Sequence, residues 1–172
     1  MDAQAQKKAK RHKKSKAVVA DTLAASKMTA TDSMLLYAEK FIGVPYGYGS
    51  AGVKTFDCSG YVMHVYGKFG VALPHSSGSI GLACDEIKLE EVKPGDLLFF
   101  SGRSVSKSKI GHVSIVHRVD GEKIYMIHAT VQAGVIIEEL DKSEYFSKRF
   151  IMAGRLRSAT KTPKSSDKTN QD

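Results

Sequence analysis

Apolar positions recur at helical spacing in two segments of the N-terminal half of the chain. The first stripe comprises Leu35, Ala38, Phe41 and Ile42, and the second comprises Val62, Val65, Tyr66 and Phe69. Because each stripe lies on one face of a 3.6-residue period, we expect two core-facing helices, one over residues 33–42 and one starting at Cys58. The polar residues 31–33 are suited to cap the first helix, and Gly70 is suited to end the second in a left-handed conformation.

The C-terminal half has a different pattern, in which short apolar runs alternate with turn residues. These runs cover residues 97–100, 113–119, 124–127, 135–138 and 150–156. Their length and their β-branched and aromatic content predict strands, and Asp120-Gly121 between two of them is a hairpin signal. The glycine-rich residues 43–55 are interpreted as a loop. We therefore predict an α+β fold, with N-terminal helices packed on a mostly antiparallel sheet of about five to six strands.

The two ends of the chain lack this periodicity. We expect a basic disordered arm over residues 1–30, one folded domain over residues 31–157 and a disordered tail over residues 158–172. The run from Lys7 to Lys16 contributes much of the formal net charge of +8. Such an arm attracts polyanions by counterion release, and nothing in it selects among nucleic acid, membrane phosphate and anionic wall polymers. We expect no transmembrane segment, because no stretch approaches the roughly 20 apolar residues of a spanning helix.

Cys58 is the clearest candidate for chemistry. The string from Phe56 to Tyr61 puts this thiol where a loop becomes a helix. The N–H groups of a helix N-terminus favour a thiolate over a thiol, and they can also donate to an oxyanion. Its polar neighbours argue against the core role that buried cysteines usually have. Cys84 keeps a structural interpretation, and we expect both cysteines to be reduced.

A thiolate needs a proton donor for the leaving amine, and histidine suits that task. His112 follows a glycine at the start of a predicted strand, and His128 lies near the end of the next strand. His112 and His128 share a face only if the hairpin loop has an odd number of residues or the strands contain a bulge. We therefore predict a loop of three around Gly121, or a bulge. Structural or surface roles are expected for His64, His75 and His117.

Metal binding is the main alternative use of cysteine and histidine side chains. The spacing does not favour it, because the two cysteines are far apart in the sequence and no His-Glu-x-x-His string is present. We expect no metal and no cofactor.

The chain resembles the NlpC-type (NlpC/p60) cell-wall cysteine peptidases, which are papain-like enzymes of bacterial envelopes. The resemblance runs from about Met34 to Leu156. It rests on strings that occur in the family's order, namely Pro45-Tyr46-Gly47-Tyr48-Gly49, Asp57-Cys58-Ser59-Gly60, Leu73-Pro74, Lys93-Pro94-Gly95-Asp96, Gly111-His112-Val113 and Ile127-His128-Ala129. The string after Leu73-Pro74 departs from the family, which often has arginine and then threonine or serine where this chain has His75-Ser76.

The resemblance implies hydrolysis of an amide bond in the peptidoglycan stem peptide, between D-glutamate and the diamino acid that follows it. It implies that Cys58 is the nucleophile, His112 the base and His128 the residue that orients His112. The matching strings further imply that Tyr46 helps to hold the oxyanion and that Asp57 and Ser59 grip polar groups of the substrate. The location implied by this substrate is the cell envelope, periplasmic or secreted.

Two other functions stay open from the sequence. One is a papain-like amidase or acyltransferase that acts on another substrate, although relatives that act on lipids place histidine before cysteine in the chain, the reverse of the order found here. The other is a catalytically silent module that binds the wall or a polyanion, for which the basic arm is the main support.

Overall fold

The computed structural model of the chain describes residues 28–157, so the predicted arm and tail lie largely or wholly outside the described residues. The helices are α2 (Ala30–Glu39), α3 (Cys58–Lys68), α4 (Ser77–Leu82) and α5 (Glu144–Arg149), with single 3-10 turns η1 (Leu89–Glu91) and η2 (Leu140–Lys142). The strands are β1 (Ala51–Gly52), β2 (Thr55–Phe56), β3 (Cys84–Ile87), β4 (Leu97–Ser101), β5 (Ile110–Asp120), β6 (Lys123–Thr130), β7 (Gly134–Glu139) and β8 (Phe150–Leu156). None of the helices in these residues has the length and apolar composition of a membrane span.

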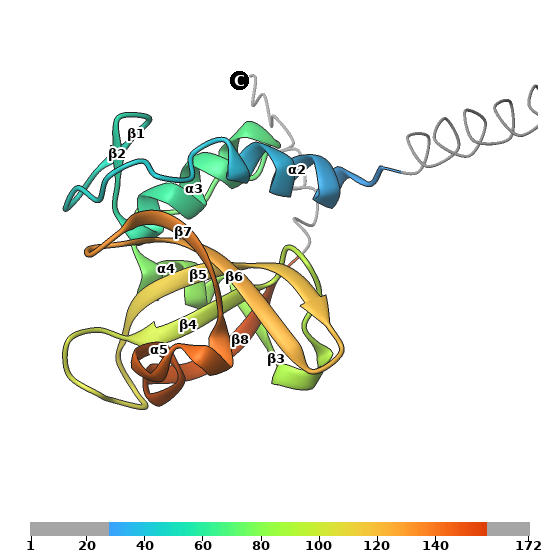
Figure 1. Cartoon of the computed structure of the whole chain (residues 1–172), viewed down its shortest axis with the longest axis vertical. Coiled ribbons are helices and arrows are strands. Elements are labelled where there is room, and N and C mark those ends of the chain that lie inside the picture. The colour runs from blue at the N-terminus through green and yellow to red at the C-terminus, as the bar shows by residue number, and fades with distance from the viewer. Residues whose placement is uncertain (1–27, 158–172) are drawn as a thin grey trace, which may run out of the picture.

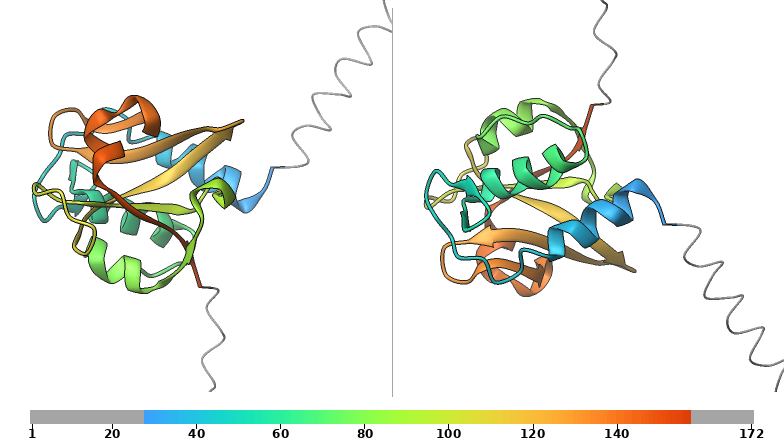
Figure 2. Two further views of the ribbon diagram at one scale, coloured as in Figure 1. Left: turned by 90° about the horizontal axis from the view of Figure 1, so that it is seen from below. Right: turned by 90° about the horizontal axis from the view of Figure 1, so that it is seen from above.

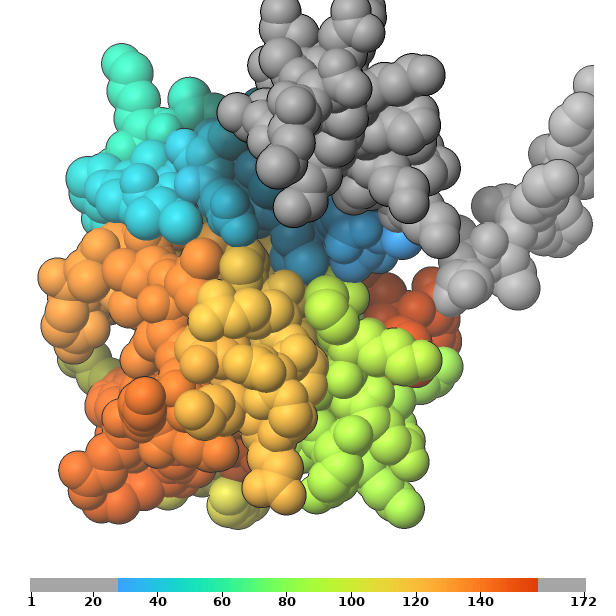
Figure 3. Space-filling model, turned by 45° about the vertical axis from the view of Figure 1, so that its right-hand side comes forward, coloured from blue at the N-terminus to red at the C-terminus, as the bar shows by residue number. Residues whose placement is uncertain are grey.

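Six strands form one antiparallel sheet, which agrees with the predicted pairing and number of strands. Their order in the sheet is β3-β8-β4-β5-β6-β7 (Figure 1). The helices α2, α3 and α4 cover one face of the sheet, and α5 with η2 covers the other (Figures 1 and 2). In Figure 3 the blue and cyan residues of the N-terminal segment lie directly on the yellow and orange residues of β5 to β7. The predicted α+β class is confirmed.

The sheet separates two hydrophobic cores. The larger core joins the three N-terminal helices to the sheet and includes Leu35, Tyr61, Val65, Ile80, Phe99 and Ile115. The smaller core lies under α5 and includes Leu98, Phe100, Val116, Met126, Leu140 and Phe146. Strand residues alternate between the two cores, because successive side chains of a strand point to opposite faces.

Several local elements differ from the prediction. Helix α2 begins at Ala30, three residues early, because Thr29 and Asp32 form a capping box in which each side chain accepts the other's backbone N–H. The short β1–β2 hairpin lies within residues 43–55, which were interpreted as a loop. Neither α4 nor β3 was predicted. The sequence of α4, Ser-Gly-Ser-Ile-Gly-Leu, shows almost no apolar period that could indicate a helix. Ser76 caps this helix through the Ser79 N–H.

A β-bulge at His117 sets the relative facing of the two candidate histidines. The pairing of β5 with β6 shifts between Val116 and Arg118, while Asp120 pairs with Lys123 across a two-residue turn. The turn residue Gly121 has a φ of +60°. The bulge, rather than a longer loop, therefore satisfies the predicted parity. Ile115 pairs with Ile127, so these two side chains point to the same face of the sheet. His112 is an odd number of residues from Ile115, and His128 is the residue after Ile127. Both histidines therefore point to the opposite face.

Asp96 ties the turn before β4 to the last strand. Its buried carboxylate accepts two hydrogen bonds from the Arg155 guanidinium, at 2.8 and 2.7 Å, and a third from the Lys93 N–H at 2.7 Å. The adjacent Gly95 carbonyl accepts the Tyr66 hydroxyl of α3. This turn therefore connects the helical layer to two strands of the sheet.

We expect Asp96→Ala to lower the free energy of unfolding by about 2–3 kcal/mol, because hydrogen bonds to a charged group are lost and the Lys93 N–H loses its partner. Urea denaturation monitored by circular dichroism measures this change. Asp120→Ala, at the exposed hairpin, is the matched control and should cost less than about 0.5 kcal/mol. Equal losses in the two variants would contradict the proposed role of Asp96.

Candidate active site

Asp57 organises the first turn of α3. As the N-cap residue, it accepts hydrogen bonds from the Gly60 N–H at 2.6 Å and from the Ser59 hydroxyl at 3.0 Å. Its second oxygen lies 2.8 Å from Nε2 of His75. These contacts fix the backbone on both sides of Cys58, which is the first residue of the helix. The prediction that Cys58 lies in the first helical turn is confirmed.

Gly60 allows the β1–β2 hairpin to lie against this turn. A Cβ at position 60 would come within 2.2 Å of the Ser50 carbonyl oxygen and 3.0 Å of Nε2 of His75. The same Ser50 carbonyl accepts the Asp57 N–H at 2.8 Å. Only glycine fits this close approach, so residue 60 is fixed by packing rather than by helix propensity.

Cys58 is buried against the sheet, with a relative exposure of 7%. The nearby backbone N–H groups of Val113 in β5, Ser59 and Cys58 act to lower the pKa of its thiol. Burial nevertheless dominates and raises the pKa of the Cys58 thiol. The expectation that the helix N-terminus leaves Cys58 ionised is therefore corrected for the free protein, because desolvation outweighs the donors.

The Tyr46 hydroxyl lies beside Cys58. Burial together with the nearby Cys58 and Asp57 raises the pKa of Tyr46 to about 12, although the Cys58 backbone N–H opposes this rise. Tyr46 is held by an isolated β-bridge to Phe56 and by edge-on contact with the ring of Tyr48, at 5.2 Å between centroids. Tyr46 therefore keeps its proton over the neutral pH range and can act as a hydrogen-bond donor.

Three titratable side chains from three neighbouring strands form a chain of hydrogen bonds. Nε2 of His112 lies 2.8 Å from Nδ1 of His128, and Nε2 of His128 lies 2.7 Å from a carboxylate oxygen of Glu138. The ring of His112 contacts Phe100 and Phe146, at 5.9 and 4.9 Å between centroids. This aromatic packing leaves little freedom for the imidazole to turn.

Burial governs the charge of both rings. It holds the pKa of His112 well below its usual value, and the neighbouring His128 lowers it further. Burial also lowers the pKa of His128, although Glu138 opposes this effect. The pKa of Glu138 is lowered by His128 in spite of its own partial burial. At neutral pH the free protein therefore holds two neutral imidazoles and one carboxylate.

Cys58 and His112 approach each other from opposite sides of strand β5. Cys58 belongs to the core beneath α3, whereas the ring of His112 packs beside Phe146 on the side of α5. Within residues 28–157, His112 and His128 are joined by a hydrogen bond, but Cys58 and His112 are not.

A cavity of about 270 Å³ opens beside His112 and Tyr46. It is bordered by the segment before β1, the β4–β5 loop, the β6–β7 turn and α5, through Tyr46, Tyr48, Arg103, His112, Gln132, Tyr145 and Phe146 among others. The β4–β5 loop is fastened by Arg149, which donates to the carbonyls of Gly102 and Arg103 at 3.2 Å each. Lys107 of this loop donates in turn to the Phe150 carbonyl at 2.8 Å.

The remaining histidines and the second cysteine occupy other sites. His64 lies 3.0 Å from the Tyr37 hydroxyl, and His117 lies 2.6 Å from a Glu39 oxygen. Cys84 and Cys58 are both free and buried, and Cys84 lies 3.4 Å from the Ile80 carbonyl in the larger core. Among the described residues, no group of three or more His, Cys, Asp or Glu side chains is arranged to hold a metal ion.

Sequence reasoning missed two residues of this site. His75 was assigned a structural or surface role, yet it contacts Asp57 next to the thiol. The signal available was its place directly after Leu73-Pro74, where the family pattern changes. Glu138 was only part of a predicted strand. Its two-residue spacing from Ile136, the partner of His128, would have placed it on the histidine face had the pairing been known.

The fold is α+β and papain-like. Its helices pack on an antiparallel sheet that carries the two histidines, and the thiol lies at the N-terminus of one of these helices. The model of the NlpC/P60 family matches residues 43–155, and the chain belongs to that family. A crystal structure of an NlpC/P60 family protein from Bacillus cereus superimposes with a TM-score of 0.66 at 28% identity, over 75% of this chain and 41% of that one.

Two curated relatives match parts of the chain. A probable endopeptidase p60 from Listeria monocytogenes is 38% identical over 97 residues, which are 54% of this chain and 20% of the relative. A gamma-DL-glutamyl hydrolase from Bacillus subtilis is 33% identical over 129 residues, which are 74% of this chain and 30% of the relative. The chain therefore spans less than a third of the length of either relative.

The lowered pKa values of His112 and His128 predict that acidification destabilises the fold. In the unfolded chain both groups regain ordinary values near 6.5, so the unfolded state binds more protons as the pH falls through that value. The free energy of unfolding should therefore decrease between pH 7 and pH 5, and thermal unfolding across that range measures the decrease.

His112→Phe, which suits the aromatic surroundings, should reduce this pH dependence. The Glu138 carboxylate does not obscure the comparison, because its own contribution is lost only as the pH falls below about 4.5. Identical slopes for the variant and the parent would contradict the lowered pKa of His112.

Proposed function

We propose that the chain is a cysteine endopeptidase that hydrolyses an amide bond in peptidoglycan stem peptides, between D-glutamate, linked through its γ-carboxyl group, and the following diamino acid. The observation that carries this proposal is the position of Cys58 at the capped N-terminus of α3, together with the hydrogen-bonded pair of His112 and His128 on the sheet. The family supports peptidoglycan as the substrate. The glutamyl bond is favoured by the name of the Bacillus subtilis relative.

In the proposed acylation step, Nδ1 of His112 accepts the thiol proton of Cys58 as the sulfur attacks the scissile carbonyl carbon. The C–S bond forms and the carbonyl electron pair moves onto oxygen. The intermediate then collapses, the C–N bond breaks, and His112 returns the proton to the leaving amine. A neutral thiol and a neutral imidazole are the starting forms, in agreement with the directions of both pKa shifts.

Water completes the proposed cycle by attacking the thioester. It transfers a proton to Nδ1 of His112, the C–S bond breaks, and the released product carries a new carboxyl group. The proton then returns to the sulfur of Cys58. Both steps require a closer contact of His112 with Cys58 than the free protein has, which is typical of catalytic hydrogen bonds that tighten only when substrate is bound.

The oxyanion of each tetrahedral intermediate is assigned to the Cys58 N–H and the Tyr46 hydroxyl. The Cys58 N–H lies near enough to the Tyr46 hydroxyl to affect its pKa. The N–H is fixed by the backbone, and the hydroxyl can turn its hydrogen toward an oxygen that binds between the two groups. The raised pKa of Tyr46 keeps its hydroxyl protonated for this task.

The proposal also covers substrate recognition and the cellular location of the protein. The exposed guanidinium of Arg103, at the rim of the cavity, suits a carboxylate of the stem peptide. The polar groups of Asp57 and Ser59 bond to each other, so we assign them to holding the thiol turn before any contact with substrate. The proposed location is the cell envelope, periplasmic or secreted. Binding of an anionic wall polymer is assigned to the basic residues 7–16, which lie outside the described residues.

A silent binding module is the second candidate. It is favoured by the burial of Cys58 and the lack of a hydrogen bond from Cys58 to His112 within residues 28–157. A relative described as a non-catalytic NlpC/p60 domain protein, with an adaptation to peptidoglycan binding, shows that this outcome occurs in the fold. An amidase or acyltransferase with another substrate is the third. The assay that follows separates all three.

Purified muropeptides incubated with the parent protein should yield two fragments divided after D-glutamate, as measured by mass spectrometry. Cys58→Ala should abolish the cleavage, because no other group can form the thioester. Cys84→Ala is the matched control, since it removes the other buried thiol and should retain activity. Wall binding without cleavage by the parent would instead favour the silent module. Neither binding nor cleavage would favour a different substrate.

Tyr46→Phe should lower kcat by about 10²–10³-fold, the usual effect of removing one oxyanion donor, while KM changes little. Tyr48→Phe, which alters the neighbouring exposed ring in the same way, should retain activity within about twofold. Steady-state rates on a synthetic stem peptide measure both variants. A rise in KM at constant kcat for Tyr46→Phe would assign this hydroxyl to substrate binding instead.

A further inference from the structure

The chain of hydrogen bonds that ends at Glu138 extends beyond the residues of the proposed mechanism. We propose that Glu138 is a positioning residue, and that its carboxylate fixes the tautomers of both His128 and His112 so that Nδ1 of His112 is the basic nitrogen. This inference rests on the proposed function for its catalytic meaning. The tautomers themselves are a property of the free protein.

The argument begins at the carboxylate, because an ionised carboxylate accepts hydrogen bonds and cannot donate them. The 2.7 Å contact with Glu138 therefore requires a proton on Nε2 of His128. A neutral imidazole has only one N–H, so Nδ1 of His128 is left as an acceptor. The 2.8 Å contact between the rings then requires a proton on Nε2 of His112. The lone pair of His112 consequently resides on Nδ1.

The strand register explains why these three groups meet. Ile136 of β7 pairs with His128 of β6, and Glu138 lies two residues further along β7 on the same face. The ring of His128 is fully buried and the Glu138 side chain is only about a quarter exposed, at 26%. A carboxylate with so little access to water finds its best partner in the imidazole N–H.

The position of Nδ1 gives the tautomer its consequence. Nε2 of His112 is occupied by His128, whereas Nδ1 has no hydrogen-bond partner among the described residues, and His112 borders the cavity. The nitrogen that is left unprotonated is therefore the one that is still free to accept a proton. Without an acceptor at position 138, His128 is free to carry its proton on Nδ1. Nε2 of His112 then accepts the hydrogen bond from His128, and the proton of His112 lies on Nδ1. Nδ1 can therefore no longer act as the base for Cys58.

Nitrogen-15 NMR of the free full-length protein tests this assignment directly, because long-range proton–nitrogen correlations distinguish the two neutral tautomers of a histidine. The parent should show Nε2–H forms for both His112 and His128. Glu138→Ala should introduce the Nδ1–H form at both rings. Glu138→Gln should preserve much of the parent pattern, since its amide oxygen can still accept from His128.

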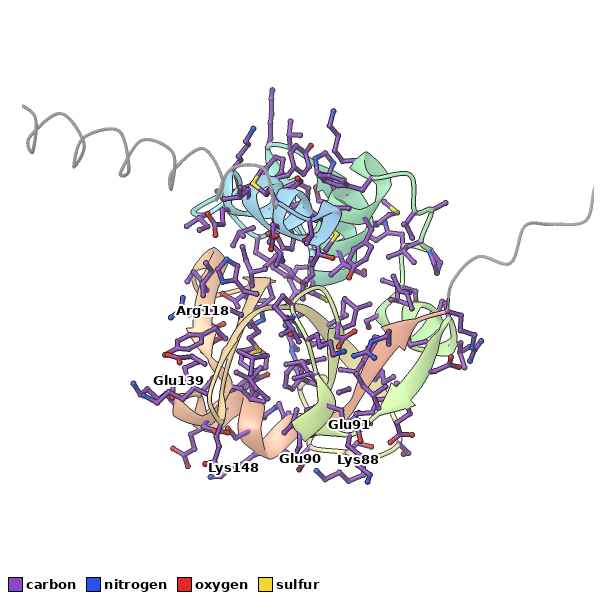
Figure 4. All side chains as sticks on the ribbon, turned by 90° about the vertical axis from the view of Figure 1, so that its right-hand side faces the viewer. Lys88, Glu90, Glu91, Arg118, Glu139 and Lys148 are labelled. Atoms are coloured by element: carbon purple, nitrogen blue, oxygen red, sulfur yellow. The ribbon has the colours of Figure 1, made fainter. Side chains whose placement is uncertain are left out.

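Kinetics on a stem peptide provide the second readout. Glu138→Ala should lower kcat/KM by about 10–100-fold, the range typical for groups that orient a histidine from outside the reacting centre. Glu138→Gln should recover a large part of this loss. The matched control is Glu139→Ala. Glu139, labelled in Figure 4, is the next residue of β7 and so points to the opposite side of the strand. Its carboxylate pairs with Lys142 at 3.1 Å. Its removal should leave both the tautomers and the rate unchanged.

The outcomes separate this inference from the proposed peptidase activity. A parent spectrum with Nδ1–H at either ring overturns the assignment, as do unchanged tautomers in Glu138→Ala. If the alanine variant fails to fold, the parent spectrum and the glutamine variant still decide the matter, because complete loss of the Nε2–H forms in Glu138→Gln would contradict the acceptor role of residue 138. Muropeptides that stay intact would contradict the peptidase proposal alone, because the spectra are recorded without substrate.

Discussion

The structure of the site depends on one side chain, the carboxylate of Asp57. As the cap of α3 it accepts the Gly60 N–H and the Ser59 hydroxyl, and it also contacts His75. These bonds determine where the helix starts, and hence where the sulfur of Cys58 lies. The hairpin that carries Ser50 packs on the same turn because residue 60 has no side chain. Every other group of the site is arranged around a thiol whose backbone is fixed in this way.

Burial and charge act against each other throughout this region. The larger core encloses Cys58 and the smaller core surrounds His112 with aromatic rings, so each of the two groups is neutral when it is alone. The groups that oppose this effect are the Val113 N–H, which lowers the pKa of the thiol, and Glu138, which raises that of the outer histidine. In the proposed mechanism, charge develops at these groups only when proton transfer and bond formation occur together.

The sequence was sufficient for the features that depend on local pattern. Apolar periodicity predicted the long helices and the main strands, and the polar string around Cys58 predicted a thiol in the first helical turn. Strand parity predicted either a three-residue loop around Gly121 or a bulge, and the structure has the bulge, at His117. The ionisation of Cys58 was beyond local pattern, because it depends on how deeply the sheet buries the sulfur. The roles of His75 and Glu138 depend on contacts made by distant segments, which no local pattern contains.

The fastening of the β4–β5 loop has a consequence for how this site can evolve. Arg149 and Lys107 hold the loop through the main-chain carbonyls of Gly102, Arg103 and Phe150 rather than through the side chains at those positions. A carbonyl is present whatever residue occupies a position, so the fastening tolerates replacement of the side chain at position 103. Under the proposed function, substitution at the rim would change the preference among stem peptides while the main-chain fastening of the loop stays the same.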